Sequence, residues 1–152
     1  MLPIMLDVVT MKILVVGAGK IATRKIQKLV AAGNSPTVIA PVASDYVQKA
    51  AVAKKITWHK RIYQIGDTAD FQMIFICTND DRVNHEITRD ILPTQLVNDT
   101  TNKANSNFFN LASFTYHDFE IALSSKGKSP SQTKELKEKL QQILRNEDSL
   151  NS

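Results

Sequence analysis

One short stretch of the sequence constrains the fold more than any other. Residues 12–16 (KILVV) form an apolar run, rich in β-branched side chains, that ends directly on Gly17. Behind this glycine, apolar side chains recur at helical spacing until Gly33; they are Ala22, Ile26, Leu29 and Val30. A buried strand, a tight turn and an amphipathic helix in this order predict the first βα unit of a parallel sheet.

The turn has the Gly-x-Gly-x-x-Ala spacing of a dinucleotide site. Gly17 permits the tight turn, Gly19 lets a phosphate approach the backbone, and Ala22 lets helix and strand pack closely. Lys20 and Arg24 stand near the helix start, where the helix dipole is already positive, so we expect them to face an anion. The N–H groups of the first helical turn would bind a pyrophosphate. The alternative is a generic tight turn between strand and helix.

Two further segments are expected to contact the cofactor. Ala40 and Pro41 end the second predicted strand, where a ribose-binding carboxylate usually stands; Asp45 lies slightly beyond. No arginine is present there for a 2′-phosphate, which favours NAD over NADP. Residues 78–80 follow the predicted strand 71–77; a helix N-cap is their alternative role, and both roles can coexist. The predicted cofactor-binding residues are Gly17, Gly19, Lys20, Ile21, Ala22, Ala40, Pro41, Thr78, Asn79 and Asp80.

Strands and helices alternate over the first hundred residues. Further strands are expected at 37–40, 56–60, 71–77 and 95–98, with helices near 44–54 and from Asn79 or Asp80 to Pro93. This order predicts an α/β fold with a Rossmann-like, doubly wound parallel sheet over residues 1–107. Strand 71–77 is the most hydrophobic and is expected to be central. Residues 99–107 form a polar loop without periodicity.

A different pattern follows the sheet. Residues 108–114 and 119–125 read as a β-hairpin, and Ser129, Pro130 and Gln132 have the pattern of a helix start with a capping box. A two-stranded hairpin is marginally stable alone, and the last helix has an apolar stripe. We therefore predict a small dimerisation segment, hairpin plus helix, over residues 108–146, and a disordered tail over 147–152.

Composition excludes several classes of protein. The formal charge of +4 is too weak to indicate nucleic-acid binding, and no apolar stretch is long enough to span a bilayer. Cys77 is the single cysteine, which excludes an internal disulfide and fits a reducing compartment. We expect a cytoplasmic protein.

Three motifs resemble one family. MLPIMLDVVTMKILVVGAGKIATRK, ICTNDDRVNHEI and IALSSKGKSPSQTKELKEKL, in this order, are similar to segments of the precorrin-2 dehydrogenase module of siroheme synthases. The resemblance implies oxidation of precorrin-2 to sirohydrochlorin with NAD, in tetrapyrrole biosynthesis, and a homodimer. In some members, insertion of ferrous iron follows.

The resemblance also implies a site for a polycarboxylate. Cations and hydroxyl groups near the glycine turn, the polar loop and the hairpin would line it; they are Arg24, Lys103, Ser124, Ser125, Lys126, Lys128 and Ser129. For the lysines, the alternative is a solvated hairpin.

Two departures from the family pattern bear on chemistry. Thr101 stands where the family has its proposed catalytic aspartate, so we predict Asp99, two residues earlier, as the base. The chain also ends after one helix, where full modules continue. His59, His85 and His117 show no ligand spacing, so we predict no metal site, and the ferrochelatase activity of some members is doubtful for this chain.

Two other functions stay open. The first is a non-catalytic NAD-binding module that carries or senses a tetrapyrrole, or docks on a partner of the same pathway. The second is a generic Rossmann oxidoreductase with an unrelated substrate, which leaves the motif at residues 124–130 unexplained.

Overall fold

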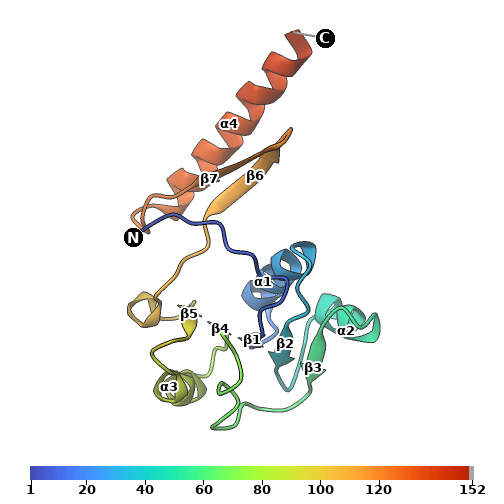
Figure 1. Cartoon of the computed structure of the whole chain (residues 1–152), viewed down its shortest axis with the longest axis vertical. Coiled ribbons are helices and arrows are strands. Elements are labelled where there is room, and N and C mark those ends of the chain that lie inside the picture. The colour runs from blue at the N-terminus through green and yellow to red at the C-terminus, as the bar shows by residue number, and fades with distance from the viewer. Residues whose placement is uncertain (151–152) are drawn as a thin grey trace. The chain divides into compact units, whose positions relative to one another are not determined.

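The structure, a computed structural model, describes residues 1–150, and the side chains as far as residue 147. Two units make up the chain (Figure 1). The first comprises Ile4–Phe108, and the second comprises Met1–Pro3 together with the chain from Phe109 onward.

The first unit is a five-stranded parallel sheet with helices on both faces. Its strand order is β3-β2-β1-β4-β5, and every pairing is parallel. The strands are β1 (Ile13–Val16), β2 (Thr37–Ile39), β3 (Thr57–His59), β4 (Met73–Ile76) and β5 (Leu96–Asp99); the helices are α1 (Lys20–Ala31), α2 (Asp45–Val52), α3 (Asp81–Asp90) and a 3₁₀ turn, η1 (Lys103–Asn105). The predicted Rossmann-like α/β fold is confirmed.

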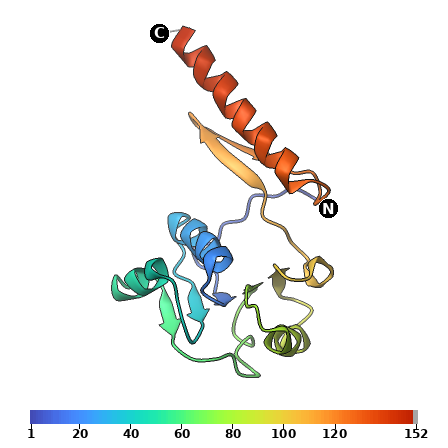
Figure 2. The ribbon, with the colours of Figure 1, turned by 180° about the vertical axis from the view of Figure 1, so that it is seen from behind.

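Strand β1 divides the core into two layers. Ile13 and Val15 face the cluster that α1 and α2 cover, while Leu14 and Val16 face the cluster that α3 covers. The two helical layers can be followed in Figures 1 and 2, where α1 and α2 lie on one side of the strands and α3 on the other. All four residues of β1 are buried, because a strand between two helical layers needs apolar side chains on both faces.

The expected position of the most hydrophobic strand is corrected by one place. β4 is fully buried, as its composition predicts, but β1 is the middle strand and β4 lies between β1 and β5. Hydrophobicity reports burial on both faces and pairing on both edges, and every interior strand shares these conditions. It therefore does not distinguish the middle strand from its neighbour.

The polar segment after β5 covers the edge of the sheet that β5 forms. The Asn107 side chain accepts a hydrogen bond from the N–H of Val97 (2.7 Å) and donates one to the carbonyl of Gln95 (2.8 Å). The Ser106 hydroxyl accepts from the N–H of Asp99 (2.8 Å). These side chains satisfy edge groups that a sixth strand would otherwise bind. The predicted polar loop therefore has a structural role, which is to bond the backbone of β5.

The second unit consists of a hairpin and one helix. Strands β6 (Ala112–Tyr116) and β7 (Phe119–Leu123) are antiparallel, and α4 spans Pro130–Leu150. β6 begins four residues later than predicted, because residues 107 and 108 bond to β5. Residues 147–150 belong to α4, which corrects the predicted disordered tail there: no glycine or proline follows Pro130 to end the helix. Residues 151 and 152 lie outside the described residues.

The edge closure leads to a stability prediction. Asn107→Ala removes the acceptor for a backbone N–H of β5, so we expect a loss of about 1–3 kcal/mol in the free energy of unfolding. The control is Gln27→Ala, which shortens an exposed amide on α1 and should stay within about 0.5 kcal/mol of wild type. Urea unfolding measures both, and equal stabilities of the two variants would contradict the assignment.

Candidate dinucleotide site

The turn after β1 presses against the end of β4. Gly17 has φ +105°, a conformation that favours glycine, and a Cβ there would stand 2.4 Å from the carbonyl oxygen of Cys77. The N–H of Gly17 donates to the carbonyl of Ile39 (2.9 Å), at the end of β2. The turn is therefore held by the two strands on either side of β1.

Gly19 has a different reason to lack a side chain. It is the N-cap of α1, and a Cβ built on it would meet no protein atom within 4 Å. No side chain caps the helix, and its first turn contains no acidic residue. Lys20, Ile21 and Arg24 are exposed around it, while Ala22 is fully buried against the sheet. Open space before uncapped N–H groups, with cations beside it, suits a pyrophosphate.

The end of β2 is tied to the same turn. The Ser44 N–H donates to the carbonyl of Ala18 (3.2 Å), and the hydroxyls of Ser44 and Thr23 are 2.7 Å apart. Ala40 is buried, and its carbonyl accepts a bond from the indole N–H of Trp58 (3.0 Å). Thr23 and Ser44 are not among the predicted site residues, since a hydroxyl pair between two helix starts has no sequence signature.

The end of β4 leads into a capped helix. The Thr78 hydroxyl accepts from the N–H of Asp80 (2.8 Å), and the Asp80 carboxylate accepts from the N–H of Val83 (3.1 Å). Buried Asn84 donates to the carbonyl of Thr78 (3.2 Å) and was not singled out either. The N-cap role is confirmed for Asp80. Contact of residues 78–80 with the cofactor stays a prediction.

Asp99, at the end of β5, is only 3% exposed and organises the loop behind it. One carboxylate oxygen accepts from the N–H and hydroxyl of Thr101 (2.8 and 2.7 Å) and the N–H of Asn102 (3.1 Å); the other accepts from the Asn105 amide (2.8 Å). Burial raises the pKa of this carboxyl, but the donors of Asn105, Thr101 and Asn102 outweigh it and hold the pKa below its ordinary value. The predicted catalytic role of Asp99 stays a prediction.

The residues predicted to bind substrate are divided between the units. Arg24 and Lys103 are exposed in the first unit, and the others lie in the second. The hydroxyls of Ser124 and Ser125 accept from the N–H groups of Lys126 and Ser129 (3.0 Å each). The Ser129 hydroxyl accepts from the N–H of Gln132 (3.4 Å), as the capping box predicts. Lys126 and Lys128 are exposed, and a common site for these residues stays a prediction.

The histidines lie on separate elements: His59 in β3, His85 in α3 and His117 between β6 and β7. Among the described residues, no three His, Cys, Asp or Glu side chains gather as a metal site would require. No helix between residues 1 and 150 is long and apolar enough to cross a membrane.

Comparison with known proteins identifies the family of this chain. A family described as putative NAD(P)-binding matches residues 4–112. A precorrin-2 dehydrogenase of Priestia megaterium is 32% identical over 140 residues, which are 92% of this chain and 69% of that protein. The solved structure of SirC, a precorrin-2 dehydrogenase, superposes with a TM-score of 0.86 at 31% identity, over 94% of this chain and 71% of that one. The chain belongs to the precorrin-2 dehydrogenase family.

Two further relatives differ in how much of their length this chain spans. The siroheme synthase of Pseudoalteromonas atlantica is 33% identical over 143 residues, and this chain spans 31% of its length. A precorrin-2 dehydrogenase of Bacillus subtilis is 27% identical over 144 residues, which are 89% of that protein. The family predicted from three sequence motifs is thereby confirmed, and a nicotinamide dinucleotide is the cofactor class that fits the turn at Gly19.

The open turn of this family member leads to a binding prediction. Gly19→Asp fills the space before the helix with a negative charge and should abolish NAD binding without unfolding the protein, because no protein atom lies within 4 Å of the new Cβ. Gln27→Asp adds the same charge at an exposed position on α1 and should bind NAD like wild type. Calorimetry measures both; unchanged affinity in folded Gly19→Asp would disprove the assignment.

Proposed function

We propose that this chain oxidises precorrin-2 to sirohydrochlorin with NAD as the hydride acceptor. The observation that carries the proposal is similarity to precorrin-2 dehydrogenases over more than nine-tenths of the chain. When bound, the nicotinamide ring accepts the hydride that the macrocycle loses, and a proton is released, so the products are sirohydrochlorin, NADH and H⁺.

The residues of the first unit bind and orient the cofactor in this proposal. The N–H groups at the uncapped start of α1, with Lys20 and Arg24, would hold the pyrophosphate. Ala40 and Pro41 would contact the ribose at the end of β2, and residues 78–80 would contact the cofactor at the end of β4. No arginine stands at residues 40–45 to bind a 2′-phosphate, which supports NAD over NADP.

Cations serve the substrate, because precorrin-2 carries many carboxylates. Exposed Lys103, Lys126 and Lys128 are suited to bind them through charge-assisted hydrogen bonds. Ser125 and Ser129 already accept backbone bonds, so their hydroxyls first shape the turn that presents these lysines. Hydride transfer then depends mainly on how well the two reactants are positioned.

An assay without oxygen, so that NAD is the only oxidant, tests the proposal. Wild type with precorrin-2 and NAD should produce NADH and sirohydrochlorin in equal amounts, followed by absorbance. Gly19→Asp should be inactive and Gln27→Asp active. A wild type that binds NAD and precorrin-2 but forms no NADH would overturn the proposal in favour of a non-catalytic binding module, which the threonine at position 101 also favours.

For Asp99 we propose a loop-ordering role in place of proton transfer. Its carboxylate is buried, accepts four hydrogen bonds and has a lowered pKa, all of which make it a weak base. Asp99→Asn replaces one acceptor oxygen with an N–H₂ group that faces other donors, so the variant should have a lower melting temperature. Its turnover should change less than tenfold, and the pH profile should be unchanged. A stable variant with turnover reduced about 10²–10⁴-fold would instead establish Asp99 as the base.

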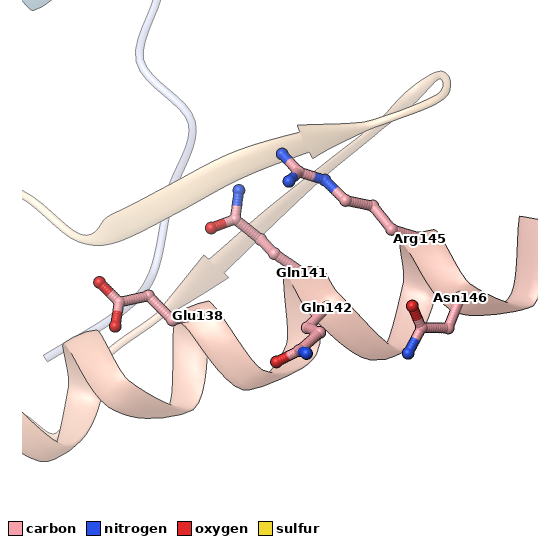
Figure 3. Close-up of a pocket in the computed structure, with 5 residues that line it drawn as sticks. All are labelled: Glu138, Gln141, Gln142, Arg145 and Asn146. Atoms are coloured by element: carbon pink, nitrogen blue, oxygen red, sulfur yellow. The ribbon is translucent and has the colours of Figure 1, made fainter.

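We also propose that the second unit mediates a homodimer. Of residues 109–147, only Phe114 is buried, and Lys137 lies 6.0 Å above its ring. Phe119, Leu136 and Ile143 are 68%, 50% and 54% exposed. A pocket of about 420 Å³ runs along α4, lined by Glu138, Gln141, Gln142, Arg145 and Asn146 (Figure 3). A hairpin and helix with so small a core need cover, and a second copy supplies it.

Sedimentation velocity at micromolar concentration tests the dimer. Wild type should sediment as a dimer, and Ile143→Glu, which places a charge on the apolar stripe of α4, should shift it toward monomer. Gln132→Glu adds the same charge at the exposed start of α4 and should remain dimeric. A monomeric wild type would disprove this part of the proposal.

A further inference from the structure

A partly buried cation lies within the first unit, and the proposed chemistry does not use it. Lys25 extends from α1 across β4, where its ammonium lies 4.9 Å from the centre of the Phe75 ring. The same ammonium donates to the side-chain oxygen of Asn98, on β5, at 2.7 Å. Burial lowers the pKa of Lys25, although the neighbouring thiol of Cys77 opposes this effect. Burying an ammonium is unfavourable, so its contacts must compensate for lost hydration.

Asn98 connects the Lys25 ammonium to the backbone at Phe108. Its side chain is 6% exposed, and its N–H₂ group donates to the carbonyl of Phe108 at 3.0 Å. Both ends of one amide are therefore engaged, the oxygen by a cation and the nitrogen by a carbonyl. A cation on the amide oxygen polarises the group and strengthens the bond that its N–H donates.

Phe108 is also held through its ring and its N–H. The ring meets Phe75 edge-on, with centroids 5.4 Å apart and planes at 78°, and the N–H donates to the carbonyl of Val97 (3.4 Å). Lys25, Asn98 and Phe75 thus converge on one residue. Phe108 is the last residue of the first unit, and the chain beyond it forms the hairpin and α4.

We propose that Lys25 is a positioning residue: acting through the Asn98 amide, its ammonium fixes Phe108, and with it the point at which the proposed substrate-binding segment leaves the dinucleotide-binding unit. The part of the proposal that concerns substrate rests on the proposed function; the part that concerns Phe108 does not. Because α1 begins at the glycine turn, this contact links the cofactor helix to the connection between the units.

Two variants separate this role from simple packing on Phe75. Lys25→Met keeps the length of the apolar stem and removes the ammonium. Asn98→Asp keeps an acceptor for Lys25 but has no N–H to donate to Phe108. The control is Lys28→Met, which removes an exposed cation from the same helix.

Hydrogen–deuterium exchange of residues 105–109 is the first measurement. We expect exchange about tenfold faster in Lys25→Met and Asn98→Asp, with Lys28→Met and the amides of β1 and β4 unchanged. Exchange at the wild-type rate in Asn98→Asp would overturn the proposal, since the bond from the Asn98 N–H₂ group to Phe108 would then have no effect on these residues. Unchanged exchange in Lys25→Met would overturn it too, as would faster exchange throughout β1 and β4, which indicates a general loss of stability.

Kinetics and calorimetry supply the second measurement. Both variants should raise KM for precorrin-2 several-fold while kcat and the Kd for NAD stay within about twofold of wild type. A fall in kcat at unchanged KM would overturn the positioning role. If wild type shows no turnover, the proposed function fails, while the exchange experiment still decides whether Lys25 fixes Phe108. If Lys25→Met does not fold, Asn98→Asp carries the test.

Discussion

The first unit depends on one close contact, the approach of Gly17 to the carbonyl of Cys77. A Cβ at Gly17 would stand 2.4 Å from that oxygen, so any side chain would push the turn away from the end of β4. The N–H of Gly17 also donates to the carbonyl of Ile39 at the end of β2, and α1 begins three residues after Gly17. Strand register, the direction of α1 and the open space before Gly19 therefore depend on a position where only hydrogen fits.

The sequence predicts this part of the fold well, because its causes are local. Apolar runs bounded by glycine or proline predict strands, and helical spacing predicts α1. The alternation of strands and helices therefore follows directly from the sequence of residues 12–98. The Gly-x-Gly spacing predicts different roles for the two glycines, the tight turn for Gly17 and the approach of a phosphate for Gly19, but it does not predict the contact that causes the difference. Gly17 is required by the protein, whereas Gly19 faces open space, and this difference depends on how close β4 comes to each of them.

The segment after β5 shows what a sequence pattern cannot predict. Residues 99–107 have no periodicity and read as a solvated loop, yet Asn107 and Ser106 bond the edge of β5 and Asn105 bonds the carboxylate of Asp99. Bonds from side chains to backbone have no fixed repeat, so nothing in the sequence distinguishes them from solvation. The same limit applies to Asp99. A carboxylate at a strand end suggests a catalytic base, but its pKa depends on hydrogen-bond donors that only the folded loop brings to it.

The cations of α1 have two different environments. Arg24 and Lys25 are neighbours in sequence, but successive residues of a helix point about 100° apart. Arg24 is therefore exposed beside the glycine turn, while Lys25 reaches over Phe75 to Asn98. Positive charge near the start of a helix is unfavourable for the helix itself. The cofactor anion proposed for the turn would compensate for the exposed cations, whereas an amide and an aromatic ring compensate for the buried one. The same helix therefore carries the proposed pyrophosphate contacts at its start and, through Lys25 and Asn98, a contact that leads to Phe108.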